Sequence, residues 1–540
     1  MRGVRGLVLL VLALWAPLLR GQQPPGDLGR IDFPTSGSPE AQAHFLRGAL
    51  LLHSFEYEDA AAEFRRARKI EPGFVMACWG EAMTFNHPLW MERDRDGARK
   101  ALEELAASRE ARAGKAPTRR EKMYLDAAEV LYADGEKAER DRAYAEAMHR
   151  LHEEFPEDLD AASFYALALL GTCEGRRDIP TYMRAAAVVE EVFARNPEHP
   201  GAAHYLIHSY DDPIHAPLGM RAARVYSKIA PAATHALHMP SHIFLASGMW
   251  DEVAASNEAA WQASLDRAAR QKLGADAHSF HALSWLGYAY LQQGRYAEAR
   301  RTLELMKRDA AKSGSKRARS HLVTMRAAYL VETGQWNGDA ARRPVEADDL
   351  SPRNLELFVQ GWRALETGDR AAAGQILRKM DTGGKKEGDG AGHAHAVSTA
   401  DGSGWLETDA VLRKELESKI AFAAGETDRA LALAREAAAL EDATSYEFGP
   451  PDIVKPAHEL AGEMLLAAGR AAEARKEFEA ALARAPRRAA SLLGLARAAS
   501  SQGDAVAARK AYGQLREVWK RADAGVAGLS EARRADTKRG

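Results

Sequence analysis

Residues 48–72 read GALLLHSFEYEDAAAEFRRARKIEP, and residues 462–486 read GEMLLAAGRAAEARKEFEAALARAP. Both segments place alanine, phenylalanine, alanine and proline 12, 16, 19 and 24 residues after an initial glycine. These positions are Gly48, Ala60, Phe64, Ala67 and Pro72, and Gly462, Ala474, Phe478, Ala481 and Pro486. Small residues at helical spacing let two helices approach closely, and proline ends a helix because it lacks an amide hydrogen. The recurrence of this pattern in two distant parts of the chain predicts a repeated helix-turn-helix unit.

Units of this kind resemble the tetratricopeptide repeat, which implies an all-α solenoid, a right-handed superhelix of antiparallel helix pairs. Looser copies start at Gly287, followed by Ala299 and Leu303, and at Gly361, followed by Ala373 and Leu377. Glycines are expected in the turns between paired helices at Gly248, Gly294, Gly368, Gly425 and Gly469. Charged residues make up 28% and aromatic residues 7% of the chain, and β-branched residues seldom cluster, which favours helices throughout. We expect at least six repeats between residues 39 and 520.

The N-terminus carries Arg2 and Arg5 before an apolar run from Leu7 to Leu19, a pattern typical of a secretory signal. We therefore predict a bacterial protein exported to the periplasm or the medium, with no stable membrane span after signal removal. A retained N-terminal anchor is the alternative. The expected organisation is a signal at 1–22, a linker at 23–38, a solenoid at 39–380 with a histidine-rich groove at 199–281, a flexible glycine-rich insertion at 381–404, C-terminal repeats at 405–522 and a polar tail at 523–540.

Histidines are concentrated in residues 199–281, which hold nine of the 18 in the chain. His204 and His208 are four residues apart, as are His238 and His242, so each pair is expected on one helix face. The two pairs are 34 residues apart, which is the repeat length, and the resemblance implies that both face the concave groove. His281 resembles a third groove-facing site, and His278 lies at the expected helix start.

Three adjacent helices are thereby expected to direct imidazoles at one patch of the groove. Neutral imidazoles suit a divalent metal ion: nitrogen ligation favours zinc or copper, and iron becomes plausible if a carboxylate such as Asp211 joins. His235 is a further candidate, in an expected interhelical loop. The alternative is that the histidines are packed or hydrogen-bonded core residues.

A second resemblance, to a group of exported bacterial tetratricopeptide proteins, rests on HPGAAHYLIHSYDDP, HALHMPSHIFLASGMWDEVAASNEAAW, EFGPPDIVKPAHELAGEMLLAAGR and MACWGEAMTFNHPLW. This resemblance implies the fold and brings no reaction with it. Within the last segment Glu81 is expected to face the groove beside His87, and Tyr165 in FYALALL to point inward. Glu81 could equally be an exposed carboxylate on the groove wall.

The sequence lacks the motifs of several common enzyme classes, which disfavours hydrolase and nucleotide-dependent functions. His458 and Glu459 lack the second histidine of the zinc-protease pattern, because residue 462 is glycine. The chain has no G-x-S-x-G elbow and no phosphate loop. A formal net charge of −2 shows no basic excess, so nucleic acid is not an expected partner.

Two functions remain. The first is a binder that holds a protein, a peptide or a small ligand in its groove, with a histidine-lined divalent-metal site. The second is a metal-dependent enzyme that uses the same histidines and leaves one coordination position open.

Overall fold

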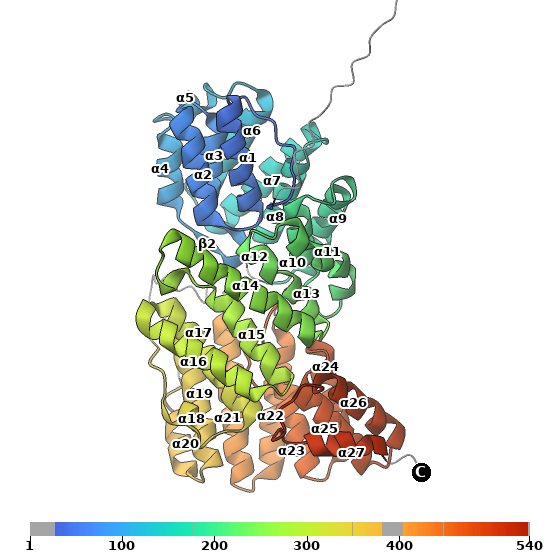
Figure 1. Cartoon of the computed structure of the whole chain (residues 1–540). Helices are drawn as coiled ribbons and strands as arrows, with labels where there is room; N and C mark the ends of the chain where they lie inside the picture. The colour runs from blue at the N-terminus through green and yellow to red at the C-terminus, as the bar shows by residue number, and fades with distance from the viewer. Residues whose placement is uncertain (1–26, 175, 348, 381–402, 447, 538–540) are drawn as a thin grey trace, which may run out of the picture.

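The computed structural model describes residues 27–174, 176–347, 349–380, 403–446 and 448–537, and it confirms the all-α prediction (Figure 1). Within these ranges the strands are β1 (Asn86–His87) and β2 (Glu92–Arg93), which pair antiparallel around the 3-10 helix η1 (Pro88–Trp90). None of the helices in these ranges combines the length and hydrophobicity that crossing a bilayer requires.

Consecutive helices pack as pairs along the chain. The helices of the first half are α1 (Pro39–His53), α2 (Tyr57–Ile70), α3 (Val75–Met83), α4 (Arg95–Glu103), α5 (Arg109–Ala113), α6 (Arg119–Leu131), α7 (Lys137–Glu154), α8 (Leu159–Gly171), α9 (Ile179–Arg195), α10 (Pro200–Tyr210), α11 (Ala216–Ile229), α12 (Thr234–His238), α13 (Pro240–Ala246) and α14 (Trp250–Gln271). The second half holds the 3-10 helix η2 (Ala275–Ala277), α15 (Phe280–Gln292), α16 (Tyr296–Ser313), α17 (Lys316–Thr333), α18 (Asp339–Arg342), α19 (Leu350–Glu366), α20 (Arg370–Leu377), α21 (Ser403–Ala423), α22 (Thr427–Ala443), α23 (Ala457–Ala467), α24 (Ala471–Arg484), α25 (Ala489–Ser501), α26 (Ala505–Val518) and α27 (Leu529–Thr537).

The glycines of the repeat pattern make room for its phenylalanine. A Cβ atom on Gly48 of α1 or Gly80 of α3 would lie 2.7 or 2.4 Å from the Phe64 ring of α2. In the C-terminal copy, Gly462 and Gly494 flank Phe478 in the same way, at 2.9 and 2.3 Å. Such approaches are closer than real Cβ contacts, so each phenylalanine seats between two helices only because both carry glycine. The predicted helix-pair unit is confirmed in both places.

The turn glycines also lie where the pattern predicts. Gly248 follows α13 with φ of +64°, a left-handed conformation that favours glycine. Gly294, Gly368, Gly425 and Gly469 have positive φ as well.

The C-terminal helices pack against the middle of the chain. The indole Nε1 of Trp250 donates to the carbonyl of Arg487 at 3.1 Å, and that of Trp519 donates to the carbonyl of Gln292 at 3.1 Å. Arg488 is buried between the Tyr288 hydroxyl at 2.8 Å and Glu459 at 2.8 Å. Figure 1 shows these red and orange helices beside the green and yellow ones. The central helices are therefore covered from the C-terminal side.

The N-terminal end covers the central helices from another side. The amide of Arg30 donates to the carbonyl of Glu198 at 3.0 Å, and the His53 ring at the end of α1 contacts the Tyr205 hydroxyl of α10 at 3.0 Å. Leu28 and Phe33, in the expected linker, are buried. Helix α10, which carries two of the candidate histidines, is consequently an interior element.

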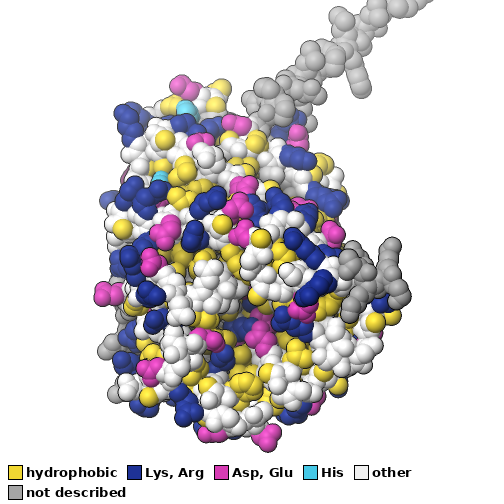
Figure 2. Space-filling view, turned by 60° about the horizontal axis from the view of Figure 1, so that its bottom comes forward, with side chains coloured by type: hydrophobic (Ala, Val, Ile, Leu, Met, Phe, Trp, Pro, Cys, Tyr) yellow, Lys and Arg dark blue, Asp and Glu magenta, His cyan; other side chains and the backbone are white. Residues whose placement is uncertain are grey.

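Some expected segments fall outside the described residues: the signal at 1–22 and most of the insertion at 381–404. The expected polar tail contains α27, in which Leu529 and Ala532 are buried. Figure 2 shows acidic and basic side chains interspersed over one face of the molecule.

Candidate metal centre

The candidate histidines of the cluster lie on four helices in the middle of the chain. Helix α10 carries His204 and His208, α12 ends at His238, and α13 carries His242. The last two are separated by Pro240, which has no amide hydrogen, so the helix is divided between them. His281 lies in the first turn of α15.

The four paired histidines are buried, not displayed on an open groove. Their exposed fractions are 0% for His204, 6% for His208, 2% for His238 and 3% for His242. His235 and His281 are half-buried. The expectation of a groove-facing cluster is corrected here, because the N-terminal and C-terminal helices enclose the central ones.

The six imidazoles form two adjoining groups of three. His204, His208 and His235 bring one ligand nitrogen each within 4.8 Å of one another, and so do His238, His242 and His281. The groups adjoin where the His208 and His242 ring centroids lie 5.2 Å apart. We name the first set the α10 triad and the second the α13 triad.

Hydrogen bonds determine which nitrogen carries the proton in the α13 triad. The Asn257 amide nitrogen donates to the carbonyl of Val253 at 2.8 Å, so its oxygen faces His238 Nδ1, at 2.6 Å. His242 Nδ1 lies 2.9 Å from Asp211 Oδ2. An amide oxygen and a carboxylate only accept, so both Nδ1 atoms carry the proton and both Nε2 atoms present lone pairs.

The two Nε2 lone pairs face each other. His238 Nε2 and His242 Nε2 are 3.1 Å apart in the interior, an arrangement that is repulsive unless a cation lies between them. Two nitrogens bound to one tetrahedral ion at about 2.0–2.1 Å are separated by about 3.3 Å. The observed spacing matches a shared metal ion, with His281 as the third nitrogen.

A proton shared between the two Nε2 atoms is less favourable than a metal ion in that place, because it requires a charged imidazole in the interior. Burial lowers the pKa of His242 to about 4, and the Asp211 carboxylate offsets this effect only in part. The His242 imidazole is therefore neutral near pH 7, as a metal ligand must be.

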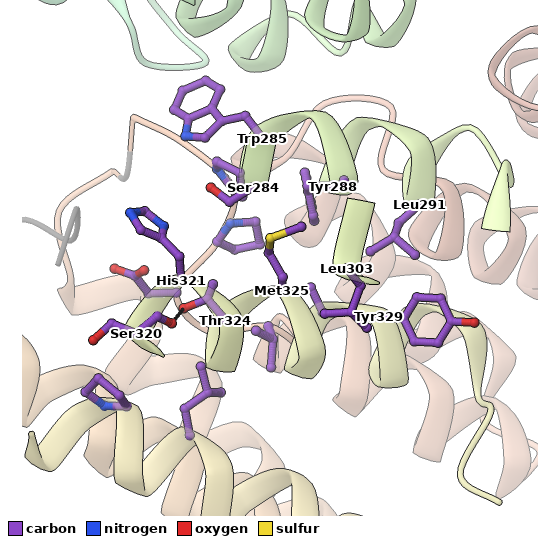
Figure 3. A pocket seen from close by; sticks show the side chains of 18 of the residues that line it. Ser284, Trp285, Tyr288, Leu291, Leu303, Ser320, His321, Thr324, Met325 and Tyr329 are labelled. Atoms are coloured by element: carbon purple, nitrogen blue, oxygen red, sulfur yellow. Dashed lines mark hydrogen bonds between the residues drawn. The ribbon is translucent and has the colours of Figure 1, made fainter. Parts of the chain in front are cut away.

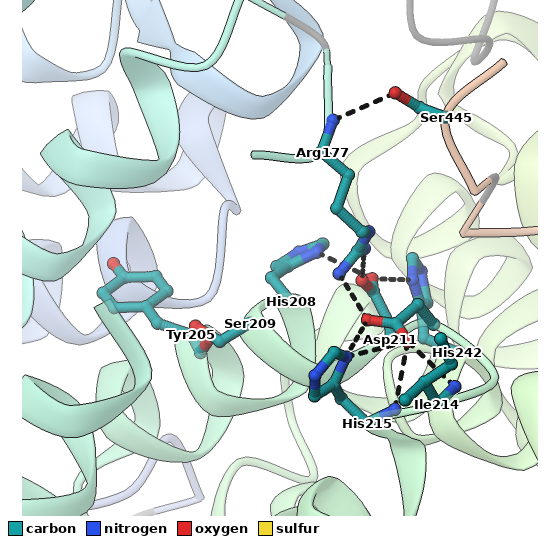
Figure 4. Close-up of polar contacts among 10 residues, drawn as sticks. Arg177, Tyr205, His208, Ser209, Asp211, Ile214, His215, His242 and Ser445 are labelled. Carbon is teal, nitrogen blue, oxygen red and sulfur yellow. Dashed lines mark hydrogen bonds and ion pairs between the residues drawn. The ribbon is translucent and has the colours of Figure 1, made fainter. Parts of the chain in front are cut away.

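Asp211 orients His242 and does not itself point into the triad. Burial raises the pKa of Asp211, but the Arg177 guanidinium and hydrogen bonds from His208 and His242 outweigh it and keep the pKa below its usual range. Figure 4 shows Arg177 and His242 converging on Asp211. The next residue, Asp212, is hydrogen-bonded through Oδ2 to His215 Nδ1 at 2.8 Å. Asp211 also forms a buried group with His208 and His242 whose ligand atoms lie within 4.8 Å of one another. The α13 triad itself offers only nitrogen ligands, a set that would favour zinc or copper over iron.

The α10 triad is held in a similar way. His204 Nδ1 faces the backbone carbonyl of His53 at 2.7 Å, so its Nε2 presents a lone pair, 3.2 Å from His235 Nε2. An N–H of His235 can satisfy that lone pair by itself. His208 Nε2 is buried and has no hydrogen-bond partner among the described residues. The α10 triad is thus a second position that can accept an ion, and His208 Nε2 is the nitrogen available to bind it.

A third buried group, His53, Asp160 and His199, has a different character. His53 Nε2 lies 2.9 Å from Asp160 Oδ1, and His199 Nε2 lies 3.5 Å from the same oxygen. His199 Nδ1 accepts the amide of Ala202 at 3.2 Å, at the start of α10. Protons point into this group, so it is a hydrogen-bonded link between α1, α8 and α10.

The remaining candidates lie elsewhere. His278 Nδ1 pairs with Asp309 at 2.8 Å, outside both triads. Glu81 is buried and ion-paired with Arg65 and Arg68 of α2, so it does not face a groove.

Two other candidates contact ordinary aromatic neighbours. The His87 ring stacks on Tyr57 with centroids 3.9 Å apart, and its Nε2 lies 3.1 Å from the carbonyl of Thr84. The Tyr165 ring lies 4.9 Å from that of His149. These residues do not reach the triads.

A pocket begins at the α13 triad. His281 and Trp285 belong to its lining, and the Trp285 ring lies 4.7 Å from that of His238 and 4.6 Å from that of His242. Figure 3 shows Trp285, Ser284 and His321 toward one end of this pocket and Leu291 and Tyr329 toward the other. An ion on His281 would therefore border a space that a ligand can enter.

Sequence reasoning missed the residues that support the triad. Asn257 is 19 residues after His238, the same spacing that places Glu63 on His44 and Glu477 on His458, each at 2.7 Å. That repeated spacing could have identified Asn257. Phe448, which stacks on His242 at 5.8 Å, comes from a segment between α22 and α23 and carries no local signal.

Comparison with known proteins assigns neither a family nor a function to this chain. No protein-family model matches this sequence, and no curated protein sequence matches it. Similar solved structures include a human IFIT1 dimer with m7Gppp-AAAA, at 14% identity over 91% of each chain and a TM-score of 0.36. A Rap protein complexed with competence and sporulation factor is 12% identical over 75% of this chain and 100% of that one, with a TM-score of 0.35. Yeast Tom70 is 13% identical over 92% and 96%, with a TM-score of 0.28. At these identities and TM-scores the likeness assigns no ligand or activity to this chain.

Proposed function

We propose that this helical-repeat protein binds a divalent transition-metal ion, zinc or copper, through His238, His242 and His281. The observation that carries the proposal is the pair of Nε2 atoms 3.1 Å apart, both left without a proton by Asn257 and Asp211. The α10 triad provides a second position, so the expected content is one to two ions per chain.

An ion bound between His238 and His242 would remove the repulsion between their buried Nε2 lone pairs. Two neutral imidazoles whose Nε2 lone pairs face each other at 3.1 Å lose solvation and repel each other. An ion accepts both lone pairs, and the oxygens on Nδ1 hold the rings in the orientation that ligation needs.

The test is elemental analysis of the purified, tag-free protein after loading with zinc or copper and removal of unbound metal. We expect His238→Ala/His242→Ala to lose the tightly held ion. The matched control is His44→Ala, which alters a histidine that faces Glu63 across the same 19-residue spacing. Failure of the wild-type protein to retain either metal would overturn the proposal.

A second candidate function, a metal-dependent enzyme, is favoured by the coordination position that the three histidines would leave open. Three protein nitrogens leave one position on a tetrahedral ion open, and His281 borders the pocket. Hydrolysis of 4-nitrophenyl acetate by the zinc-loaded protein, compared with the double alanine variant, tests this candidate. Equal rates for the two proteins would leave metal binding without catalysis.

The protein or peptide partner and the exported location stay proposals. The repeat architecture supports the partner, because stacked helix pairs are commonly used for protein recognition. The arginine-flanked run from Leu7 to Leu19 supports export. N-terminal sequencing of protein recovered from the periplasm and the medium of a bacterial host tests the second point.

A further inference from the structure

The pocket beside the α13 triad lies among helices of the second half of the chain. Its lining comes from α15, α16, α17, α19, α21 and residues 450–454. The pocket volume is about 90 Å³, counted as the space open to the centre of a water-sized sphere. A single water needs about 10–15 Å³ on that measure, so the pocket has room for a compact organic ligand in place of several waters.

Apolar side chains make up much of the wall. Leu291, Leu303, Met325, Leu355 and Leu412 line it, together with the rings of Trp285 and Tyr288. A ligand gains free energy by removing an apolar body from water against such a wall.

The lining includes two carboxyls and two imidazoles. Asp409 and Asp452 line the pocket with His281 and His321, and no lysine or arginine occurs among the described lining residues. Asp409 is 1% exposed and accepts from the Asn354 amide at 2.9 Å and the Ser351 hydroxyl at 3.2 Å. Burial raises the pKa of Asp452 to about 7. Carboxyl groups in this environment favour a cationic ligand, because an ammonium group stabilises their charged form.

We propose that this pocket binds an apolar amine: a primary or secondary ammonium group on an aliphatic or aromatic body. The ammonium group lies toward Asp409 and Asp452, with Ser320 and Thr324 as further oxygens in the lining. The body packs along the leucines and Met325, and the Trp285 and Tyr288 rings add attraction for a cation. This inference goes beyond metal binding and does not require the ion.

The test compares three probes of equal length and different head groups: octylamine, octanol and octanoate. Calorimetry on chelator-treated protein should show octylamine binding about tenfold more tightly than octanol, with octanoate weakest, because only the ammonium pairs with a carboxylate. Asp409→Asn/Asp452→Asn should bring octylamine to the level of octanol and leave octanol unchanged. A preference for octylamine that survives in this folded variant would overturn the proposal, and so would tightest binding of octanoate.

A second variant keeps the test decisive if the double asparagine variant does not fold. Leu303→Trp fills the pocket and leaves both carboxyls in place, so all three probes should lose affinity while the circular dichroism spectrum stays that of the wild type. Octylamine binding unaffected by Leu303→Trp would place the amine elsewhere.

Repeating the titration with zinc separates this proposal from the metal site. Octanoate binding that appears only with zinc and vanishes in His238→Ala/His242→Ala, with octylamine weak throughout, would assign the polar head to the ion and overturn the amine proposal. Amine binding in a protein that takes up no metal would uphold the pocket and refute the metal site.

Discussion

Two buried histidine groups in this chain have similar residues and opposite proton arrangements. In the group of His53, Asp160 and His199, both Nε2 atoms face one carboxylate oxygen, so the N–H bonds point inward. In the α13 triad, the Nδ1–H groups point outward to Asn257 and Asp211, and the lone pairs point inward. The first group places N–H groups against a carboxylate, and the second presents lone pairs that suit a cation. The direction of the N–H bond, set by the neighbouring acceptor, distinguishes a hydrogen-bonded histidine cluster from one that can accept a metal ion.

The largest effect is expected from removing the carboxylate of the structural group. Asp160→Ala leaves His53 and His199 buried without their acceptor, and breaking a buried polar pair in this way costs about 3–5 kcal/mol. Urea denaturation of the metal-free protein measures the loss. Asp160→Asn, which keeps one acceptor oxygen, should retain the wild-type metal content. A metal content that falls in this folded variant would contradict the distinction between the two groups.

Zinc should stabilise the protein through the triads alone. A ligand at one hundred times its dissociation constant adds about 2.7 kcal/mol to the free energy of unfolding. We expect a higher Tm with zinc for the wild type and for Asp160→Asn, and a smaller shift for His238→Ala/His242→Ala, which keeps only the α10 triad. An equal shift in all three proteins would mean that zinc binds elsewhere.

Acid should weaken the metal-free protein through His242. Its pKa is about 4 when folded and 6.5 for the unperturbed group, so the unfolded chain binds the proton more tightly. The contribution of neutral His242 to the free energy of unfolding is therefore fully present above pH 6.5. It falls as the pH drops toward 4, by about 2 kcal/mol between pH 7 and pH 5. Urea midpoints at these two pH values should differ less for His242→Gln. The same pH dependence in wild type and variant would refute the assignment.

The smallest effect is expected for the residue that orients His238. Asn257→Ala removes the acceptor of Nδ1–H, and loss of such a partner typically weakens metal binding 10–100-fold. We expect about tenfold, because the Ser241 hydroxyl, 3.4 Å from the same nitrogen, can replace part of the contact. Competition with a zinc chelator measures the change. Glu477→Ala, which alters the equivalent partner of His458, should leave zinc affinity unchanged.

The sequence was sufficient to predict the repeat and the pairing of the histidines. Gly48, Phe64 and Gly80 pack as the spacing of small and aromatic residues requires, because helix contacts of this kind are local. It was not sufficient to place His278. That residue precedes α15 in extended backbone, so its ring pairs with Asp309 and does not extend the triad.

By itself, the sequence determined the helix pairs, the turns between them and the register that brings His204, His208, His238 and His242 onto neighbouring helices. These features follow from residue spacing along one or two adjacent helices. Only the tertiary structure decided that the histidines are buried and which of their nitrogens keep the proton. Burial comes from helices at both ends of the chain, and the proton positions come from Asn257 and Asp211, so both depend on contacts between segments that are distant along the chain.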